Sequence, residues 1–308
     1  MAEVICVGVA FLDHIFEANP PTSPDSKTFA TEYRQFGGGM AATASVAVAL
    51  LGGRAVLWGR LGDDPAGRTI LEGLTNRGVQ TEFIRKIEGA QSPVSSVVIG
   101  EDGSRQAIVF PGRHLDNDPG WLPLGRIEET SAVLVDPRWP EAARLALERA
   151  KENHIPVILD ADVGPEPVPR ELVELSSHAI FSLAGLSQFT GTSDVDSGLQ
   201  KVRKMTDGVV GVTAGSQGFY WLSDTGTVHI PALEVTAIDT LGAGDVFHGA
   251  FALAIGEGKD METAAHFANI AAGLKCSRPG GRDAVPSRGE VWAVLRDEEA
   301  VTPPAQAS

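Results

Sequence analysis

The sequence predicts an α/β fold, an αβα sandwich with a mostly parallel central sheet and a small β-sheet lid. From Ala132 onward, short apolar stretches alternate with longer helix-like stretches, which is typical of parallel βαβ units with helices on both faces of a sheet. Earlier strand-like stretches have polar residues at alternate positions, as a sheet with one open face requires. A length of 308 residues is enough to bury the core of such a domain.

The lid is expected from the polar strands of the first third of the chain. Val94–Gly100 and Gln106–Phe110 flank a turn-forming Asp-Gly pair and so resemble a hairpin. Thr28–Phe36 is a further strand of the same kind. These strands would project from the main sheet, and we expect a lid made by roughly residues 14–36 and 94–112.

The rest of the chain, within residues 1–300, is expected to form one domain. Its strands are predicted at Glu3–Val9, Ala132–Val135, Pro156–Asp160, Ala179–Ser182, Val209–Thr213 and Glu234–Ile238. Its helices are predicted at Met40–Leu51, Glu141–Asn153, Val195–Met205, Val246–Ile255, Met261–Lys275 and Arg288–Asp297. Residues 301–308 are expected to form a flexible tail.

Composition excludes several classes of protein. The formal net charge is −15 at pH 7 and no basic stripe is present, which argues against nucleic-acid binding. The two cysteines, Cys6 and Cys276, form no disulfide framework, so a reducing cytoplasm is the simplest location. The chain has no basic leader and no apolar run of about 18 residues, and we therefore expect no membrane partner.

The most informative motif is DTLGAGD at residues 239–245, directly before a predicted helix. Gly242 and Gly244 leave the backbone uncovered, so that N–H groups at the helix start can bind an anion. Asp245 adds a carboxylate that can accept a proton. A phosphate cradle beside a base is what phosphoryl transfer to a hydroxyl requires. The alternative is an ordinary turn with Asp245 as the helix N-cap.

A second glycine cluster precedes the helix at Met40–Leu51. Together with DTLGAGD, it gives the chain from Val4 to about Pro286 a resemblance to the ribokinase/PfkB family of carbohydrate kinases. Four stretches also resemble the sulfofructose kinase branch of that family: GGGMAATA (37–44), VDPRW (135–139), GDVFHGA (244–250) and LKCSRPGGR (274–282). No Walker loop and no dinucleotide-binding glycine motif is present.

The resemblance implies a ribokinase-like fold and an ATP-dependent kinase with Asp245 as general base. Gly242, Ala243 and Gly244 would supply N–H groups that hold the transferred charge. Asp239 and Thr240 would shape the turn, near which the family places a monovalent-cation loop; K⁺ is therefore a possible cofactor. His248 is expected to pack the helix, because one base suffices.

The resemblance also implies residues for both substrates. Asp13, Gly38 and Gly39 match positions that hold the sugar, whereas the family's usual Asn is Thr43 here, so hydroxyl recognition must differ. The predicted nucleotide contacts are Thr213, Gly215, Gly218 and Asn269. Tight turns without a ligand, and a surface position for the asparagine, are the alternatives.

The chain departs from the family at its Asn-x-x-Glu motif, which orders Mg²⁺. The corresponding stretch, residues 182–185, contains Ser182 and Gly185 instead. Mg²⁺ is still expected because ATP phosphates need it, but no metal ligand follows from the sequence.

Two cations match those that the sulfofructose kinase branch uses for its sulfonate. They are Lys27, on the expected lid, and Arg138, after a strand end where open α/β sheets place ligands. Arg113 is a further candidate. Val109-Phe110 stands where that branch has a polar Asn, so the pocket for the anion is expected to be altered.

The predicted substrate is thus a ketose-like sugar, with sulfofructose or another anionic sugar as candidates. The alternatives are a neutral ketohexose kinase, a nucleoside kinase and a non-catalytic sugar-binding protein. We also expect a homodimer that pairs through the lid, because a small sheet with an exposed apolar face is marginal alone.

Overall fold

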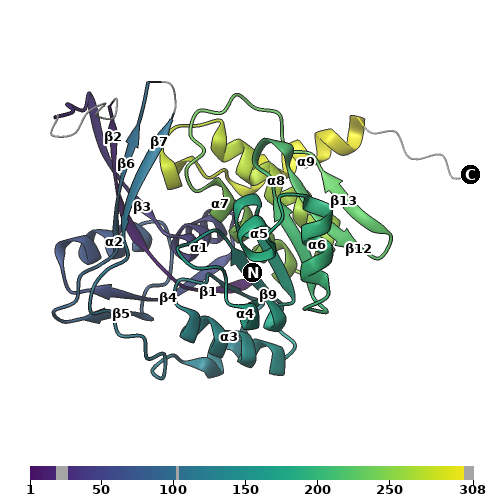
Figure 1. Cartoon of the computed structure of the whole chain (residues 1–308), viewed down its shortest axis with the longest axis horizontal. Helices are drawn as coiled ribbons and strands as arrows, with labels where there is room; N and C mark the ends of the chain where they lie inside the picture. Colours follow the sequence, from purple (N-terminus) through teal and green to yellow (C-terminus); the bar gives the residue numbers. More distant parts are fainter. Residues whose placement is uncertain (19–26, 102–103, 302–308) are drawn as a thin grey trace, which may run out of the picture.

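The computed structural model describes residues 1–18, 27–101 and 104–301 of the chain, with side chains to residue 296. Its main element is a nine-stranded sheet that crosses the molecule (Figure 1). The strands are parallel except at one edge, where β12 runs antiparallel to both of its neighbours. In spatial order they are β13 (Gly226–Ile230), β12 (Phe219–Ser223), β11 (Val209–Thr213), β10 (His178–Ser182), β9 (Val157–Ala161), β8 (Ala132–Val135), β1 (Glu3–Val7), β4 (Arg54–Gly62) and β5 (Ile84–Ile87).

Helices cover both faces of this sheet and give the sandwich its three layers. The side chains of β1 point alternately into two hydrophobic cores, one on each face of the sheet: Val4 and Cys6 pack in one, and Ile5 and Val7 in the other. The first core contains α1 (Met40–Leu50), α2 (Pro65–Thr75), α7 (Ala243–Gly256), α8 (Met261–Cys276) and α9 (Arg288–Val301). The second contains α3 (Pro140–Glu152), α4 (Arg170–Leu175), α5 (Leu183–Thr190) and α6 (Val195–Arg203).

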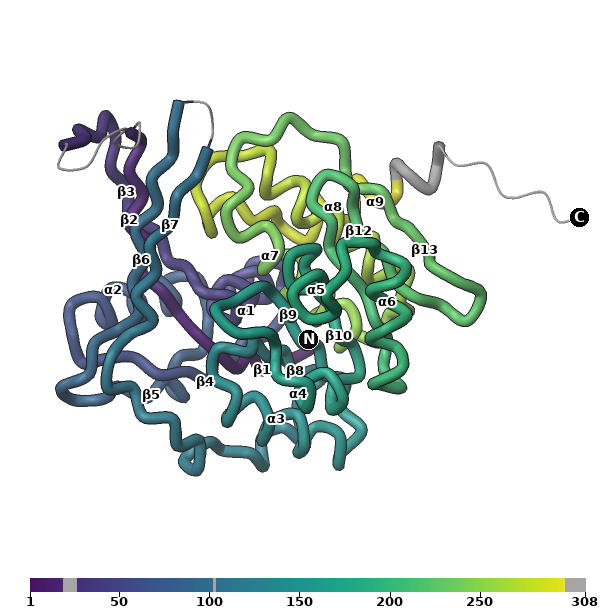
Figure 2. The backbone as a smooth tube through the Cα atoms, viewed as in Figure 1, coloured from purple at the N-terminus to yellow at the C-terminus, as the bar shows by residue number. Residues whose placement is uncertain are grey.

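A separate four-stranded sheet forms the lid. It projects beyond one end of the main sheet (Figure 2). Its strands, in spatial order, are β3 (Glu32–Gly38), β2 (Phe11–Glu17), β6 (Val94–Ile99) and β7 (Arg105–Phe110). Because β2 follows β1 after three residues and β3 leads directly into α1, the lid is joined to a strand of the main sheet and to a helix packed on it. The fold predicted from the sequence is confirmed.

Several predicted elements differ from the observed ones. Glu234–Ile238 is not a strand: it is a loop, and the N–H groups of Ile238 and Asp239 donate to the Cys276 carbonyl rather than to a neighbouring strand. The strand predicted to start at Thr28 starts at Glu32. The strands β2, β4, β5, β12 and β13 and the helices α2, α4 and α5 were not predicted.

The expected tail falls largely outside the description. The helix α9 continues to Val301, and residues 302–308 lie outside the described residues. In the part of the chain that the structure describes, no helix is both long and apolar enough to span a bilayer. The division into one domain, residues 1–300, with a lid at about 14–36 and 94–112, stays a proposal.

Candidate active site

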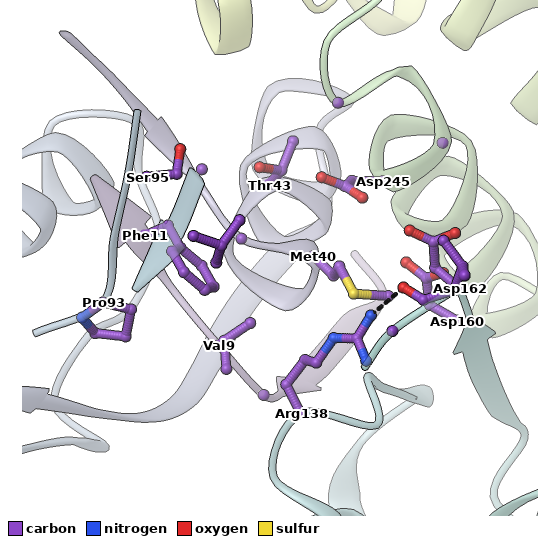
Figure 3. A pocket seen from close by; sticks show the side chains of 18 of the residues that line it. Val9, Phe11, Met40, Thr43, Pro93, Ser95, Arg138, Asp160, Asp162 and Asp245 are labelled. Atoms are coloured by element: carbon purple, nitrogen blue, oxygen red, sulfur yellow. Dashed lines mark hydrogen bonds between the residues drawn. The ribbon is translucent and has the colours of Figure 1, made fainter. Parts of the chain in front are cut away.

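One large cavity, of about 1070 Å³, lies between the lid and the carboxyl ends of the central strands. Figure 3 shows Ser95 and Phe11 on its lid side, with Asp245, Asp160 and Asp162 across from them. Most of the residues predicted for the site line this cavity: Asp13, Gly38, Gly39, Thr43, Arg138, Thr213, Thr240, Gly242, Ala243, Gly244 and Asp245. The cavity is large enough for two small substrates.

The glycine loop before α7 opens the start of the helix to the cavity. Gly242 has a left-handed backbone (φ 74°), which turns the chain into the helix. A Cβ built on Gly244 would meet no atom within 4 Å, so the backbone there faces open space. The N–H groups of Gly244 and Asp245 have no backbone acceptor among the described residues. These are the conditions for binding a phosphate at a helix N-terminus.

Asp245 lies at this helix start with its carboxylate at the cavity. Burial raises its pKa well above the usual value, the nearby Asp160 raises it further, and His248 opposes both. A carboxyl with a raised pKa is a stronger proton acceptor once it is ionised. The arrangement suits a general base for a hydroxyl bound in the cavity.

Arg282 is a buried cation that the sequence analysis quoted within a motif but did not assign to the site. Its Nε donates to Thr43 Oγ1 at 3.1 Å, and its Nη2 donates to the Gly38 carbonyl at 2.6 Å. Burial lowers its pKa to about 10, and the carboxylates of Asp245 and Asp13 oppose the shift. Arg282 therefore compensates the negative charge of the two carboxylates on either side of the cavity.

Asp13, on lid strand β2, is held by the neighbouring lid strand β6. The Ser95 hydroxyl donates to Asp13 Oδ1 at 2.6 Å, and burial raises the pKa of Asp13. Gly38 is required here because a Cβ would lie 2.0 Å from Asp13 Oδ2. At Gly37 a Cβ would lie 2.2 Å from an Arg282 nitrogen. The glycine cluster thus lets backbone, carboxylate and guanidinium approach one another.

A buried carboxylate fixes the position of Arg138. Asp136 accepts hydrogen bonds from the N–H groups of Val9, Ala41 and Arg138, at 2.9, 3.1 and 2.9 Å. These bonds join the ends of β1 and β8 to the start of α1. The Arg138 side chain extends along the cavity toward Asp160 and Asp162, and its Nη2 donates to the Val163 carbonyl (Figure 3).

The end of β9 supplies two carboxylates that the sequence analysis did not assign. Asp160 is 2% exposed, and its Oδ2 has no hydrogen-bond partner. Burial raises its pKa well above the usual value, and Asp162 and Asp136 raise it further. Ser182, which stands where the family has Asn, caps α5 and donates to Asp162 Oδ1 at 2.6 Å. The chain thus lacks the Asn-x-x-Glu motif but has two carboxylates at the end of β9, the strand beside β10.

The predicted nucleotide residues are only partly at the cavity. Thr213 lines it, whereas Gly215, Gly218 and Asn269 do not. A Cβ on Gly218 would lie 2.1 Å from the Ile230 carbonyl oxygen, so backbone packing alone requires this glycine. The Asn269 amide is buried and donates to the carbonyls of Ile230 and Pro231. It joins α8 to β13 and is not on the surface.

Three other side chains lie away from the reacting centre or are held by the backbone. Lys27 and Arg113 are exposed and do not line the cavity. His248 is buried in α7, with Nδ1 2.8 Å from the Gly244 carbonyl oxygen and Nε2 3.3 Å from that of Ile180. Burial lowers its pKa. It packs α7 against β10, but it also lines the cavity, where its Nδ1 lies 3.5 Å from Asp160 Oδ2.

The fold and this cavity define a class of protein, the α/β phosphotransferases that act on a hydroxyl group. Comparison with known proteins makes the class specific. The chain belongs to the pfkB family of carbohydrate kinases, whose family model matches residues 1–288. It is therefore an ATP-dependent carbohydrate kinase with the ribokinase-like fold.

Individual relatives agree with this assignment. The chain is 29% identical over 298 residues to the ribokinase of Bacillus subtilis (strain 168), covering 96% of this chain and all of that protein. A crystal structure from Agrobacterium tumefaciens, provisionally named a ribokinase, is 35% identical with a TM-score of 0.91 and covers 98% of this chain and 99% of that one. Arabidopsis thaliana ribokinase, solved with ribose and ATP, is 26% identical with a TM-score of 0.85 and covers 96% of this chain and 98% of its own.

Proposed function

We propose that this kinase phosphorylates the hydroxymethyl group of a ketose-like sugar that carries an anionic group, such as sulfofructose. The observation that carries the proposal is that the Arg138 guanidinium keeps hydrogen-bond donors without a partner among the described residues. Four cations line the cavity among the described residues: Arg60, Arg138, Lys275 and Arg282. The Arg138 guanidinium has a single hydrogen-bond partner there, the Val163 carbonyl. The others are each held by two or more oxygen atoms.

A guanidinium with free donors suits a sulfonate or phosphate, because its planar fork can make two parallel bonds to such an anion. Lys27, on the lid, would add a mobile charge when the lid approaches the sugar. The apolar Val109, which lines the cavity, would leave the anion to Arg138. Asp13, Gly38, Gly39 and Thr43 would hold the sugar hydroxyls.

In the reaction, Asp245 would accept the proton of the hydroxymethyl group as the oxygen attacks the γ-phosphorus of ATP. The backbone of Gly242, Ala243 and Gly244 would hold the charge on the transferred phosphoryl group. The positive charge of Arg282 would offset the repulsion between the nearby carboxylates in one enclosed cavity. Thr213 would face the nucleotide; Gly215, Gly218 and Asn269 would shape its pocket from behind.

Mg²⁺ would reach this site with ATP and neutralise charge on its phosphates. Among the described residues, no group of three or more acidic, His or Cys side chains is arranged to hold a metal alone. This fits Mg²⁺, which is commonly held by one or two carboxylates together with substrate phosphates and water. Asp160, whose Oδ2 accepts no hydrogen bond from the described residues and lies 3.5 Å from His248 Nδ1, and Asp162 are the residues that would hold it.

A neutral pentose is the second candidate, since several relatives, among them those of Bacillus subtilis and Schizosaccharomyces pombe, are named ribokinases. A substrate panel of sulfofructose, fructose and ribose separates the two. For the anionic sugar, Arg138→Ala should lower kcat/KM about 10- to 150-fold, the weight of a charge-assisted contact of about 1.5–3 kcal/mol. Arg138→Lys should restore part of this loss. The partly exposed Arg144, in α3, is the control, and Arg144→Ala should change nothing. Equal losses on charged and neutral sugars would contradict the proposal.

We also propose a homodimer that pairs through the lid. Outside the cavity, the lid region exposes Phe29, Tyr33 and Ile108, with 86, 50 and 69% of their surface accessible. Three large apolar side chains exposed in so small a region indicate a contact surface. Sedimentation of the full chain should give a dimer, and Ile108→Lys should give a monomer. A wild-type monomer would contradict this part. A cytoplasmic location stays a prediction.

A further inference from the structure

A buried lysine lies directly behind the phosphate-binding loop. Lys275, near the end of α8, has 1% of its side chain exposed. Its Nζ donates to the Leu241 carbonyl at 2.6 Å and to the Asp239 carbonyl at 2.9 Å, and lies 3.3 Å from Asp239 Oδ2. Three oxygen atoms thus surround one nitrogen, and a lysine side chain can donate to all three only as an ammonium ion.

The two carbonyls bound by Lys275 occupy special positions. In an α-helix, each N–H donates to the carbonyl four residues earlier. The carbonyls of Asp239 and Leu241 are those that the N–H groups of Ala243 and Asp245 would otherwise use. The Ala243 N–H instead reaches the Thr240 carbonyl at 3.3 Å, and the Asp245 N–H has no backbone acceptor among the described residues. Lys275 thus satisfies the loop carbonyls while the helix start keeps donors for an anion.

The Asp239 carboxylate completes this arrangement. Its Oδ1 accepts from the Leu241 N–H at 2.9 Å, and its Oδ2 accepts from the Gly281 N–H at 3.1 Å. Without a cation at the position of Nζ, two carbonyl dipoles and a carboxylate would face one another in a buried space. Such a group of oxygen atoms is destabilised unless a positive charge balances it.

We propose that Lys275 is a built-in cation that holds the phosphate-binding loop open, so that the enzyme needs no monovalent metal ion such as K⁺. Lys275 is a positioning residue, because its side chain is 1% exposed and its Nζ is held by the backbone carbonyls of Asp239 and Leu241. Its effect is on ATP binding by this kinase and does not depend on which sugar is phosphorylated.

ATP binding measured by calorimetry without any sugar tests this separately from the sugar proposal. For the wild type, the Kd for ATP and the Tm should be equal in potassium and in tetramethylammonium chloride at the same ionic strength. Lys275→Ala leaves a space among the three oxygen atoms. In tetramethylammonium it should bind ATP about 10- to 150-fold more weakly, and K⁺ or NH₄⁺ should restore most of the loss.

Lys275→Met is the matched variant, because its apolar side chain fills the space and should block rescue by either ion. The exposed Lys259→Ala, just before α8, should behave as the wild type. Three results would overturn the proposal: a wild type that requires K⁺, Lys275→Ala that binds ATP normally in tetramethylammonium, or a loss that no ion restores. The wild-type comparison decides the matter even if the variants do not fold.

Discussion

The Nε of Arg282 lies 3.1 Å from the hydroxyl oxygen of Thr43, to which it donates across 239 positions of the sequence. Thr43 is the position where the family usually has Asn, and the structure gives this departure a physical context. The threonine hydroxyl accepts a hydrogen bond from a buried guanidinium, which in turn compensates Asp13 and Asp245. The cavity wall at this position therefore carries a hydroxyl bound to a buried guanidinium rather than an amide.

Removal of Arg282 should destabilise the folded protein. Arg282→Met keeps much of the volume but leaves the Gly38 carbonyl and the Thr43 hydroxyl without their buried donor, and it removes the positive charge that offsets Asp13 and Asp245. Removing one partner of a buried polar group costs about 1–3 kcal/mol, and more where the group is charged, which denaturant unfolding would measure. Arg278→Met, which removes an exposed pair with Glu290, should cost about 1 kcal/mol or less. Equal costs for the two variants would mean that Arg282 contributes no buried pairing.

Replacement of the proposed base should separate catalysis from binding. Asp245→Asn keeps the size of the side chain but cannot accept a proton, so kcat should fall about 10²–10⁴-fold. Because the pKa of Asp245 is raised by burial, loss of its charge should not weaken folding. The Kd for ATP and the Tm should stay close to wild type. Asp194→Asn, at the exposed N-cap of α6, is the control. Near-normal turnover would show that Asp245 is not the base.

Substitutions at two glycines of α7 should have different effects, one on ATP binding and the other on the stability of the fold. Gly244→Val adds atoms into open space, so the fold should persist while ATP binding weakens by tenfold or more, about 1.4 kcal/mol. Gly249→Ala should instead destabilise the fold, because its Cβ would lie 2.4 Å from the Ala44 carbonyl oxygen. Overpacking of this kind costs about 1–3 kcal/mol. Unchanged ATP affinity in Gly244→Val would place the phosphates elsewhere.

The acid limb of the pH–rate profile should report Asp245. The base must be ionised to accept a proton, and burial together with Asp160 raises its pKa. As the pH is lowered, kcat/KM should therefore begin to fall at a pH above about 3.9, the ordinary pKa of an aspartate. Asp160→Asn removes the neighbouring charge and should shift this limb to lower pH. An unshifted limb would show that the two carboxyls do not interact.

Stability should have the opposite dependence on pH from that of a paired carboxylate. The folded pKa of Asp245 lies above its unfolded value, so the folded state binds this proton more tightly. The resulting stabilisation is present below the unfolded pKa and is lost as pH rises through the folded pKa. In Asp245→Asn this part of the pH dependence of the Tm should be absent.

The sequence by itself determined the fold class, the order of the main strands and helices, and the two glycine clusters with Asp245. These features are local: apolar alternation defines a strand, and a glycine motif before an apolar helix defines the start of that helix. The wrong strand at Glu234–Ile238 shows the limit of local patterns. Those residues satisfy their backbone at the Cys276 carbonyl, and nothing nearby in the sequence predicts this partner.

Only the tertiary structure decided which distant side chains share the site. Arg282 meets Thr43, Ser95 meets Asp13, and Lys275 meets the carbonyls of the DTLGAGD loop. Asp160 was detectable as a carboxylate ending an apolar strand, but its closeness to Asp245 depends on β9 and α7 being packed together. The physical reason is that burial and neighbouring charges determine the pKa and the chemistry of a charged side chain. Both are set by the order of strands in the sheet and by the helices packed on it.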